Sequence, residues 1–208
     1  MKRIWINQIT SEDVSKRAQV HQLAPTNPYV ALRMAQSIPH PWYRCQSLSN
    51  VAEYIKDPER QLMILNEAFE VAQIQEEINR IVTVSAWPLK ILASIHQEEA
   101  KKQLRYLMLQ AEKESHPIRR ADAIFALFMA VKGSSNLLEI VIPALVRSLL
   151  SGHGWKIDRQ IRFLVTILTR EHIFKEMVDS LIAHHRDNRE KRRLMTSLAK
   201  LGASNEYQ

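Results

Sequence analysis

Two groups of basic residues near the end of the chain have a spacing suited to binding a row of phosphate groups. Within each group the offsets from the first residue are three or four and then eleven, which places the side chains on one side of a helix. The members are Arg159, Arg162, Arg170, Arg189, Arg193 and Lys200. Two such rows could neutralise several phosphates, giving nucleic-acid binding that weakens steeply with salt. Two other interpretations stay open: a solvated basic flank, and a surface for an acidic protein segment.

A nucleic-acid enzyme would need an acid with a strongly shifted pKa near these arginines. The candidates are Asp158, which lies beside Trp155, and Asp122. The chain contains no glycine-rich phosphate loop, no Gly-x-Ser-x-Gly nucleophile motif and no His-Glu-x-x-His motif. The adjacent His184 and His185 would point about 100° apart on a helix and could not chelate one metal ion. We therefore expect no catalytic site, no metal site and no cofactor.

The segments that carry the candidate side chains contain a pattern that recurs about every forty residues. In each copy an arginine is followed by apolar residues four, seven and eleven positions later, on one face of a helix. The copies are Arg44 with Leu48, Val51 and Ile55; Arg80 with Val84, Trp87 and Ile91; and Arg120 with Ile124, Leu127 and Val131. Each apolar face needs a neighbour to bury it, so a fixed period of this length predicts stacked helices in a solenoid.

Other amphipathic stretches alternate with the arginine-bearing ones, which predicts helical hairpins with short connections. We expect about five hairpins, at residues 28–57, 58–96, 97–133, 135–170 and 172–201. Pro28, Pro58 and Pro117 would occupy first helical positions, where the missing N–H costs least. Pro88 and Pro143 lie inside predicted helices, where we expect kinks and hold a helix break as the alternative.

The two ends of the chain depart from the repeat. Residues 1–27 lack it and are predicted to form an N-terminal capping segment with one short polar helix. The pattern degrades after Arg159, where Thr166 replaces an apolar residue, as expected of a terminal repeat with one unpartnered face. The sequence thus predicts a helical repeat domain over 28–201 and a disordered tail over 202–208.

Three stretches of the chain resemble the HEAT-like family of α-helical repeats. They are AQSIPHPWYRCQSLSNVAEYI (35–55), VAQIQEEINRIVTVSAW (71–87) and AEKESHPIRRADAIFALFMAV (111–131). The resemblance implies an all-α, right-handed α-α superhelix (a solenoid) in which the arginine-bearing helices line the concave surface. The aspartate that this family often carries shortly before the arginine is absent here. The resemblance implies a fold and a style of binding without implying a partner.

Composition restricts the cellular setting. The net charge is +7, and the single cysteine, Cys45, excludes an internal disulfide and suits a reducing compartment. The longest apolar stretch, residues 137–150, contains Glu139 and Arg147 and is too short to span a bilayer. We expect a cytoplasmic protein that does not insert into membranes.

The sequence favours a non-enzymatic module that binds a protein or peptide partner, an acidic one being suited to the net charge. Nucleic-acid binding is the alternative. The candidate partner-binding residues on the concave face are Trp42, Tyr43, Arg44, Arg80, Arg120, Arg159 and Arg162. The three repeat arginines have an alternative role, hydrogen bonding to carbonyls between repeats. For Trp42, Trp87 and Trp155 we expect places in the core; exposed, they would be binding anchors.

Overall fold

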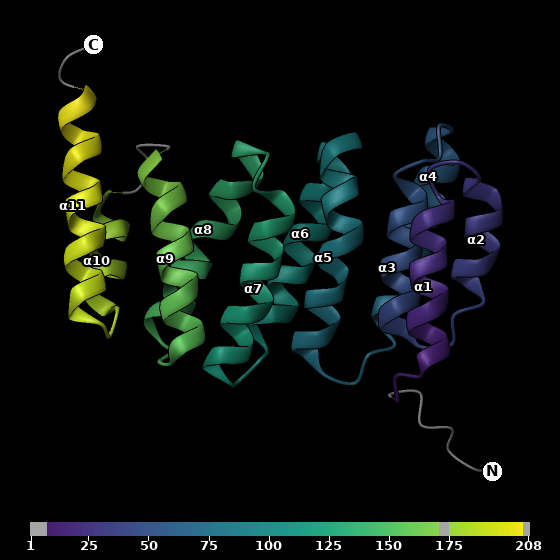
Figure 1. Ribbon diagram of the computed structural model, residues 1–208, viewed down its shortest axis with the longest axis horizontal. Helices are drawn as coiled ribbons and strands as arrows, with labels where there is room; N and C mark the ends of the chain where they lie inside the picture. The colour runs from purple at the N-terminus through teal and green to yellow at the C-terminus, as the bar shows by residue number, and fades with distance from the viewer. Residues whose placement is uncertain (1–7, 171–174, 206–208) are drawn as a thin grey trace.

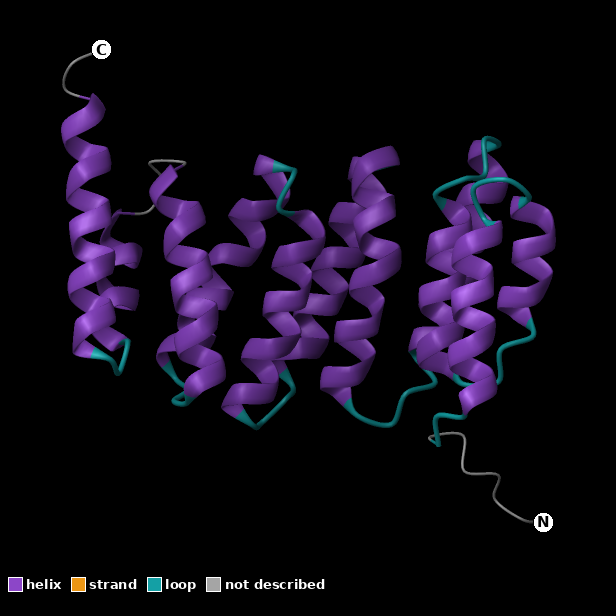
Figure 2. Cartoon of the chain, in the orientation of Figure 1, coloured by secondary structure: helices purple, strands orange, loops and turns teal. Residues whose placement is uncertain are grey.

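The computed structural model describes residues 8–170 and 175–205, with side chains for all of these except 169, 170, 175 and 200–205. All regular structure in these ranges is helical, and short loops join the helices (Figure 2). The helices are α1 (Ser11–Leu23), α2 (Pro28–Gln36), α3 (Pro41–Ala52), α4 (Pro58–Ala72), α5 (Ile78–Ile95), α6 (Gln97–Glu112), α7 (Pro117–Val131), α8 (Ser135–Leu150), α9 (Trp155–Arg170), α10 (Lys175–His184) and α11 (Asn188–Asn205). The predicted all-α class is confirmed.

The helices form two layers that run along the length of the molecule (Figure 1). Each odd-numbered helix contacts the next odd-numbered one, from α1 through α11, and we name this row of helices the odd layer. The even-numbered helices cover its other side and form the even layer. The arginine-bearing helices α3, α5, α7 and α9 all belong to the odd layer, so the sequence repeat coincides with a repeat of packing.

Prolines begin several helices where the sequence predicts them. Pro28, Pro58 and Pro117 are the first residues of α2, α4 and α7. Pro88 and Pro143 lie inside helices α5 and α8, which continue past them. The alternative of a helix break at these two prolines is therefore wrong.

The core lies between the two layers and contains the predicted apolar stripes. The nine apolar residues that follow Arg44, Arg80 and Arg120 at offsets of four, seven and eleven are buried, except Trp87, whose side chain is 48% exposed. Cys45 is fully buried, and burial raises the pKa of its thiol well above the ordinary value. Trp155 is 64% exposed and Trp42 is partly buried against the core, so the expected core position is wrong for Trp87 and Trp155.

Two of the three repeat arginines hold the loop that precedes their own helix. The Arg44 side chain donates from Nε to the Ile38 carbonyl at 2.8 Å and from Nη2 to the Pro39 carbonyl at 3.1 Å. Arg120 repeats this contact, donating from Nη1 to the carbonyl of Glu114 at 3.2 Å. In both cases the carbonyl lies six residues before the arginine. The hydrogen bonds satisfy carbonyls that no helix partner reaches.

Acidic side chains near the starts of odd-layer helices connect four of these helices to the next one in the layer. The pairs are Asp13 with the backbone N–H of His40, Glu77 with Arg119, Asp122 with Lys156 and Gln160, and Asp158 with Arg186. We name this series the acid ladder. HEAT-like repeats often carry an aspartate shortly before the repeat arginine, and this chain lacks it. The acid ladder is formed by acidic residues at other positions. In the described part of the chain, the α3–α5 interface is the odd-layer contact without such a pair.

The C-terminal boundary differs from its prediction. Helix α11 continues to Asn205 and so includes part of the segment 202–208 that the sequence predicts to be disordered. Residues 206–208, and residues 171–174 at the start of the last predicted hairpin, lie outside the described residues. Among the helices described, none is both long and apolar enough to cross a bilayer.

Candidate functional site

A groove lies on the odd layer, above α3. Helix α3 packs against both α1 and α5, but α1 and α5 do not contact each other in the described structure. Figure 1 shows α3 set between these two helices. The uncovered face of α3 is therefore the floor of a groove of about 500 Å³ whose walls come from α1 and α5.

The groove floor is polar because α3 has two different faces. Its apolar residues face the core, whereas Gln46, Ser47 and Asn50 line the groove. The hydroxyl of Ser47 and Oδ1 of Asn50 are enclosed and have no hydrogen-bond partner among the described residues. Enclosed polar atoms without partners cost free energy, about 1–3 kcal/mol each in proteins.

The walls add an aromatic surface and positive charge. Trp87 and Lys90 face the groove from α5, and Arg17 and His21 face it from α1. Glu53, directly after the last residue of α3, is the acidic residue that lines it. A half-exposed tryptophan at the edge of a groove is the type of side chain that dominates the binding energy of protein interfaces.

Arg17 is held in position by two contacts with α3. Its Nη1 donates to Oε1 of Gln46 at 3.1 Å, and its Cζ lies 5.2 Å from the centroid of the Tyr43 ring. A guanidinium above an aromatic ring is stabilised by the electron density of the ring face. The groove therefore presents a positive charge in a fixed place before any ligand arrives.

The structure separates the predicted candidates of the N-terminal half. Tyr43 supports Arg17 and so acts on the groove indirectly. Trp42 packs partly into the core, and Arg44 is engaged with loop carbonyls. Arg80 forms an ion pair with Glu77, with 3.0 Å between Nε and Oε2. Of this set, Tyr43 is the residue that the structure connects to the groove.

Arg120 lies farther along the odd layer. Besides the Glu114 carbonyl, its guanidinium reaches the hydroxyl of Ser151 at 3.2 Å, at the end of α8. The alternative role predicted from the sequence is hydrogen bonding to carbonyls between repeats. The carbonyls that Arg44 and Arg120 contact instead belong to the same predicted hairpin as the arginine itself. The sequence did not single out several groove residues that the structure brings together: Arg17, His21, Gln46, Ser47, Asn50, Glu53 and Lys90.

The four described members of the predicted basic rows are exposed, and one of them is paired with an acid. Arg159 and Arg162 lie beside Trp155 in a surface pocket of about 420 Å³ at the start of α9. Arg193, on α11, is 3.8 Å from Glu190, and Arg189 is exposed on the same helix. The side chains of Arg170 and Lys200, which belong to the predicted basic rows, lie outside the described residues.

The two acids that a catalytic hypothesis needs are both engaged. Asp122 accepts from Gln160 at 2.7 Å and from Lys156 at 3.2 Å. Burial raises the pKa of Asp158, but hydrogen bonds from Arg186 outweigh it, so the pKa lies below the ordinary 3.8. A carboxyl group held in its ionised form is a poor proton donor at neutral pH. This geometry favours a structural role for both acids.

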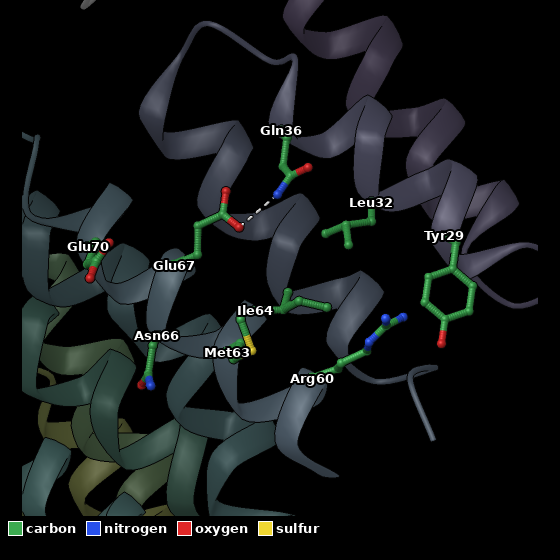
Figure 3. Close-up of a pocket in the computed structure, with 9 residues that line it drawn as sticks. All are labelled: Tyr29, Leu32, Gln36, Arg60, Met63, Ile64, Asn66, Glu67 and Glu70. Carbon is green, nitrogen blue, oxygen red and sulfur yellow. Dashed lines mark hydrogen bonds between the residues drawn. The ribbon is translucent and has the colours of Figure 1, made fainter. Parts of the chain in front are cut away.

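A second hollow lies on the even layer between α2 and α4, with a volume of about 460 Å³. Figure 3 shows two pairs among its polar groups: Gln36 donates to Glu67 at 2.9 Å, and Arg60 lies near the ring of Tyr29. Met63 also lines the hollow and is 69% exposed. Among the described residues that line this hollow, none has an enclosed polar atom without a partner, in contrast to Ser47 and Asn50 in the groove above α3.

One signal in the sequence could have indicated the groove. Trp87 is a large aromatic residue directly before Pro88. It lies seven residues after the repeat arginine, where the other two copies have the smaller Val51 and Leu127. The polar residues of α3 gave no such signal, because polar side chains on a helix are most often simply solvated. The groove exists because α1 and α5 do not contact each other in the described structure, and that is a property of helix packing which the sequence pattern does not contain.

Within the described residues, no cluster of three or more histidine, cysteine or acidic side chains could hold a metal ion. Comparison with protein-family models, curated proteins and solved structures finds no match for the chain. The likeness to HEAT-like repeats therefore stays a prediction from the sequence.

Proposed function

We propose that the protein is a non-enzymatic, cytoplasmic interaction module that binds an extended peptide segment of a partner in the groove above α3. The observation that carries the proposal is the pair of unpartnered polar atoms, Ser47 Oγ and Asn50 Oδ1, in a groove that the half-exposed Trp87 also lines. In this proposal the fold is a right-handed, HEAT-like superhelix of about five hairpins. The odd layer is its concave side.

An extended peptide matches the chemistry of the floor. Its backbone presents N–H donors and C=O acceptors along one edge, and these need partners when water is excluded. The Asn50 amide carries one acceptor and two donor hydrogens, so it can bind both kinds of backbone group. The Ser47 hydroxyl can likewise donate and accept.

The walls favour an acidic peptide with a bulky apolar side chain. Arg17, His21 and Lys90 bring basic groups to the groove, and Glu53 brings an acidic one. Charge complementarity of this kind accelerates association and selects among partners. The exposed face of Trp87 would receive the apolar side chain of the peptide, where burial of both surfaces contributes most of the affinity.

The test is selection of peptides from a phage-displayed random library on the whole protein. The enriched sequences are then synthesised with a fluorescent label and titrated by anisotropy. We expect Trp87→Ala and Asn50→Ala each to weaken binding by about tenfold or more, since each removes a central contact.

Trp155→Ala is the matched control, because it removes an exposed tryptophan on the same layer but outside the groove. Circular dichroism establishes that all three variants retain their helices. Failure to enrich any sequence, or enriched peptides that bind Trp87→Ala and Asn50→Ala as tightly as the unchanged protein, would overturn the proposal.

A further inference from the structure

The surface pocket at the start of α9 has a different character from the groove above α3. Trp155, Arg159 and Arg162 line it, and their offsets of four and seven place them on one face of α9. The Arg159 Cζ lies 5.5 Å from the centroid of the Trp155 ring. An exposed aromatic face and two guanidinium groups are thus held side by side.

The acids in this pocket are already hydrogen-bonded to other partners. Asp158 accepts from Nε of Arg186 at 2.8 Å. Asp187 accepts from the backbone N–H groups of Arg189 at 2.8 Å and Glu190 at 3.2 Å, so it caps the start of α11. Neither carboxylate is paired with Arg159 or Arg162 in the described structure. The positive charge of these two residues is left for an external anion.

A third unmet donor lies in the wall of the pocket. His185 is 1% exposed, and its Nδ1 accepts from the backbone N–H of Asp187 at 3.1 Å. That hydrogen bond places the ring proton on Nε2 in the neutral tautomer. Nε2 is enclosed and has no partner among the described residues. The pocket therefore has more donors than acceptors, as a phosphate site requires.

We infer that this pocket binds a nucleotide unit of a single-stranded nucleic acid, with the phosphate between Arg159 and Arg162 and the base stacked on Trp155. Stacking requires a base that is not covered by its neighbours, which favours a single strand over a duplex. Exposed Arg189 and Arg193 on the adjoining helix α11 extend the basic surface toward further phosphates. This site is separate from the peptide groove and does not depend on it.

The test is fluorescence anisotropy of the whole protein with fluorescein-labelled oligothymidylate of about 12 nucleotides, a length within the usual site size. A DNA duplex of equal length and a phosphoserine peptide are titrated alongside. We expect the single strand to bind more tightly than the duplex. Arg159→Gln combined with Arg162→Gln should weaken binding of the single strand by about tenfold and lower the salt slope by about 0.7, the value for one phosphate contact.

Trp155→Ala should weaken the single strand by about tenfold while leaving the salt slope unchanged, because stacking carries no net charge. Arg33→Gln combined with Arg105→Gln is the control, since it removes the same charge from exposed positions on the even layer. Absence of binding at low salt would overturn the inference, as would variants that bind like the unchanged protein. Binding of the phosphoserine peptide in place of the oligonucleotide would reassign the pocket to phosphorylated protein. Peptide selection on the groove is unaffected by any of these outcomes.

Discussion

Asp158 and Arg186 join α9 to the segment that leads into α11. The guanidinium of Arg186 reaches Oδ2 of Asp158 from Nε at 2.8 Å and from Nη2 at 2.7 Å. The backbone N–H of Arg186 donates to the other carboxylate oxygen at 3.3 Å. Asp13 accepts the backbone N–H of His40 in the same way at the opposite end of the odd layer. The acid ladder therefore begins and ends with an aspartate that holds the start of a following helix.

Replacing Asp158 with asparagine should destabilise the protein by about 1–2 kcal/mol at neutral pH, because charge-assisted hydrogen bonds to Arg186 are lost. The cost stays moderate because Arg186 is partly exposed and solvent screens the pair. The pKa of Asp158 is lowered in the folded protein, so its stabilisation is complete above the unfolded value of 3.8. That stabilisation is lost as the pH falls through the folded pKa. Urea unfolding from pH 7 to about pH 3 measures the difference, which should shrink only below about pH 4.

Glu12→Gln is the control for Asp158→Asn, because Glu12 forms an exposed pair with Lys16. Its effect should stay below about 0.5 kcal/mol at each pH. A difference for Asp158→Asn that already declines between pH 7 and pH 5 would show that another group is responsible.

Arg44→Met should destabilise the protein by about 1–3 kcal/mol, since it leaves the carbonyls of Ile38 and Pro39 without their donors. Arg80→Met removes a repeat arginine whose pair with Glu77 is about half exposed, and should cost about 0–1 kcal/mol. Thermal and urea unfolding measure both. Equal effects of the two substitutions would contradict the structural role assigned to Arg44.

The sequence predicted much of this fold because the repeat depends on the types and spacing of residues within single helices. The offsets after Arg44 and Arg120 identify the buried face of α3 and α7, and the prolines at positions 28, 58 and 117 identify helix starts. These features depend on helix periodicity and on the missing N–H of proline, which act within one or two turns.

The groove and the acid ladder could not be predicted in this way. Arg17 and Gln46 are 29 residues apart, and Asp122 and Gln160 are 38 apart, so their contacts depend on how neighbouring helices align. The exposure of Trp87 likewise follows from the absence of contact between α1 and α5. No pattern within α5 carries that information.

Trp155→Ala should change the free energy of unfolding by less than about 0.5 kcal/mol, as expected for an exposed side chain. Phe128→Ala, at a fully buried aromatic position, should cost about 3–5 kcal/mol. Urea unfolding followed by circular dichroism compares the two without relying on tryptophan fluorescence. A cost for Trp155→Ala close to that for Phe128→Ala would restore the core position that the sequence favoured.

Ser47 and Ser85 allow a test of whether an unmet hydroxyl serves binding. Both are buried, and neither Oγ has a partner in the described structure. Ser85 does not line the groove, so Ser85→Ala should raise stability by about 0.5–1 kcal/mol, by removing an unsatisfied group and improving helix propensity. Ser49→Ala is the control, because its hydroxyl already donates to the Cys45 carbonyl at 2.7 Å.

Ser47→Ala should stabilise the free protein by a similar amount, about 0.5–1 kcal/mol, and should also weaken peptides selected on the groove. The two effects arise from one cause, because the hydroxyl that lacks a partner in the free protein gains one in the complex. Thermal unfolding measures the first effect and anisotropy the second. If Ser47→Ala raises the stability of the free protein but leaves peptide affinity unchanged, the Ser47 hydroxyl has no part in binding.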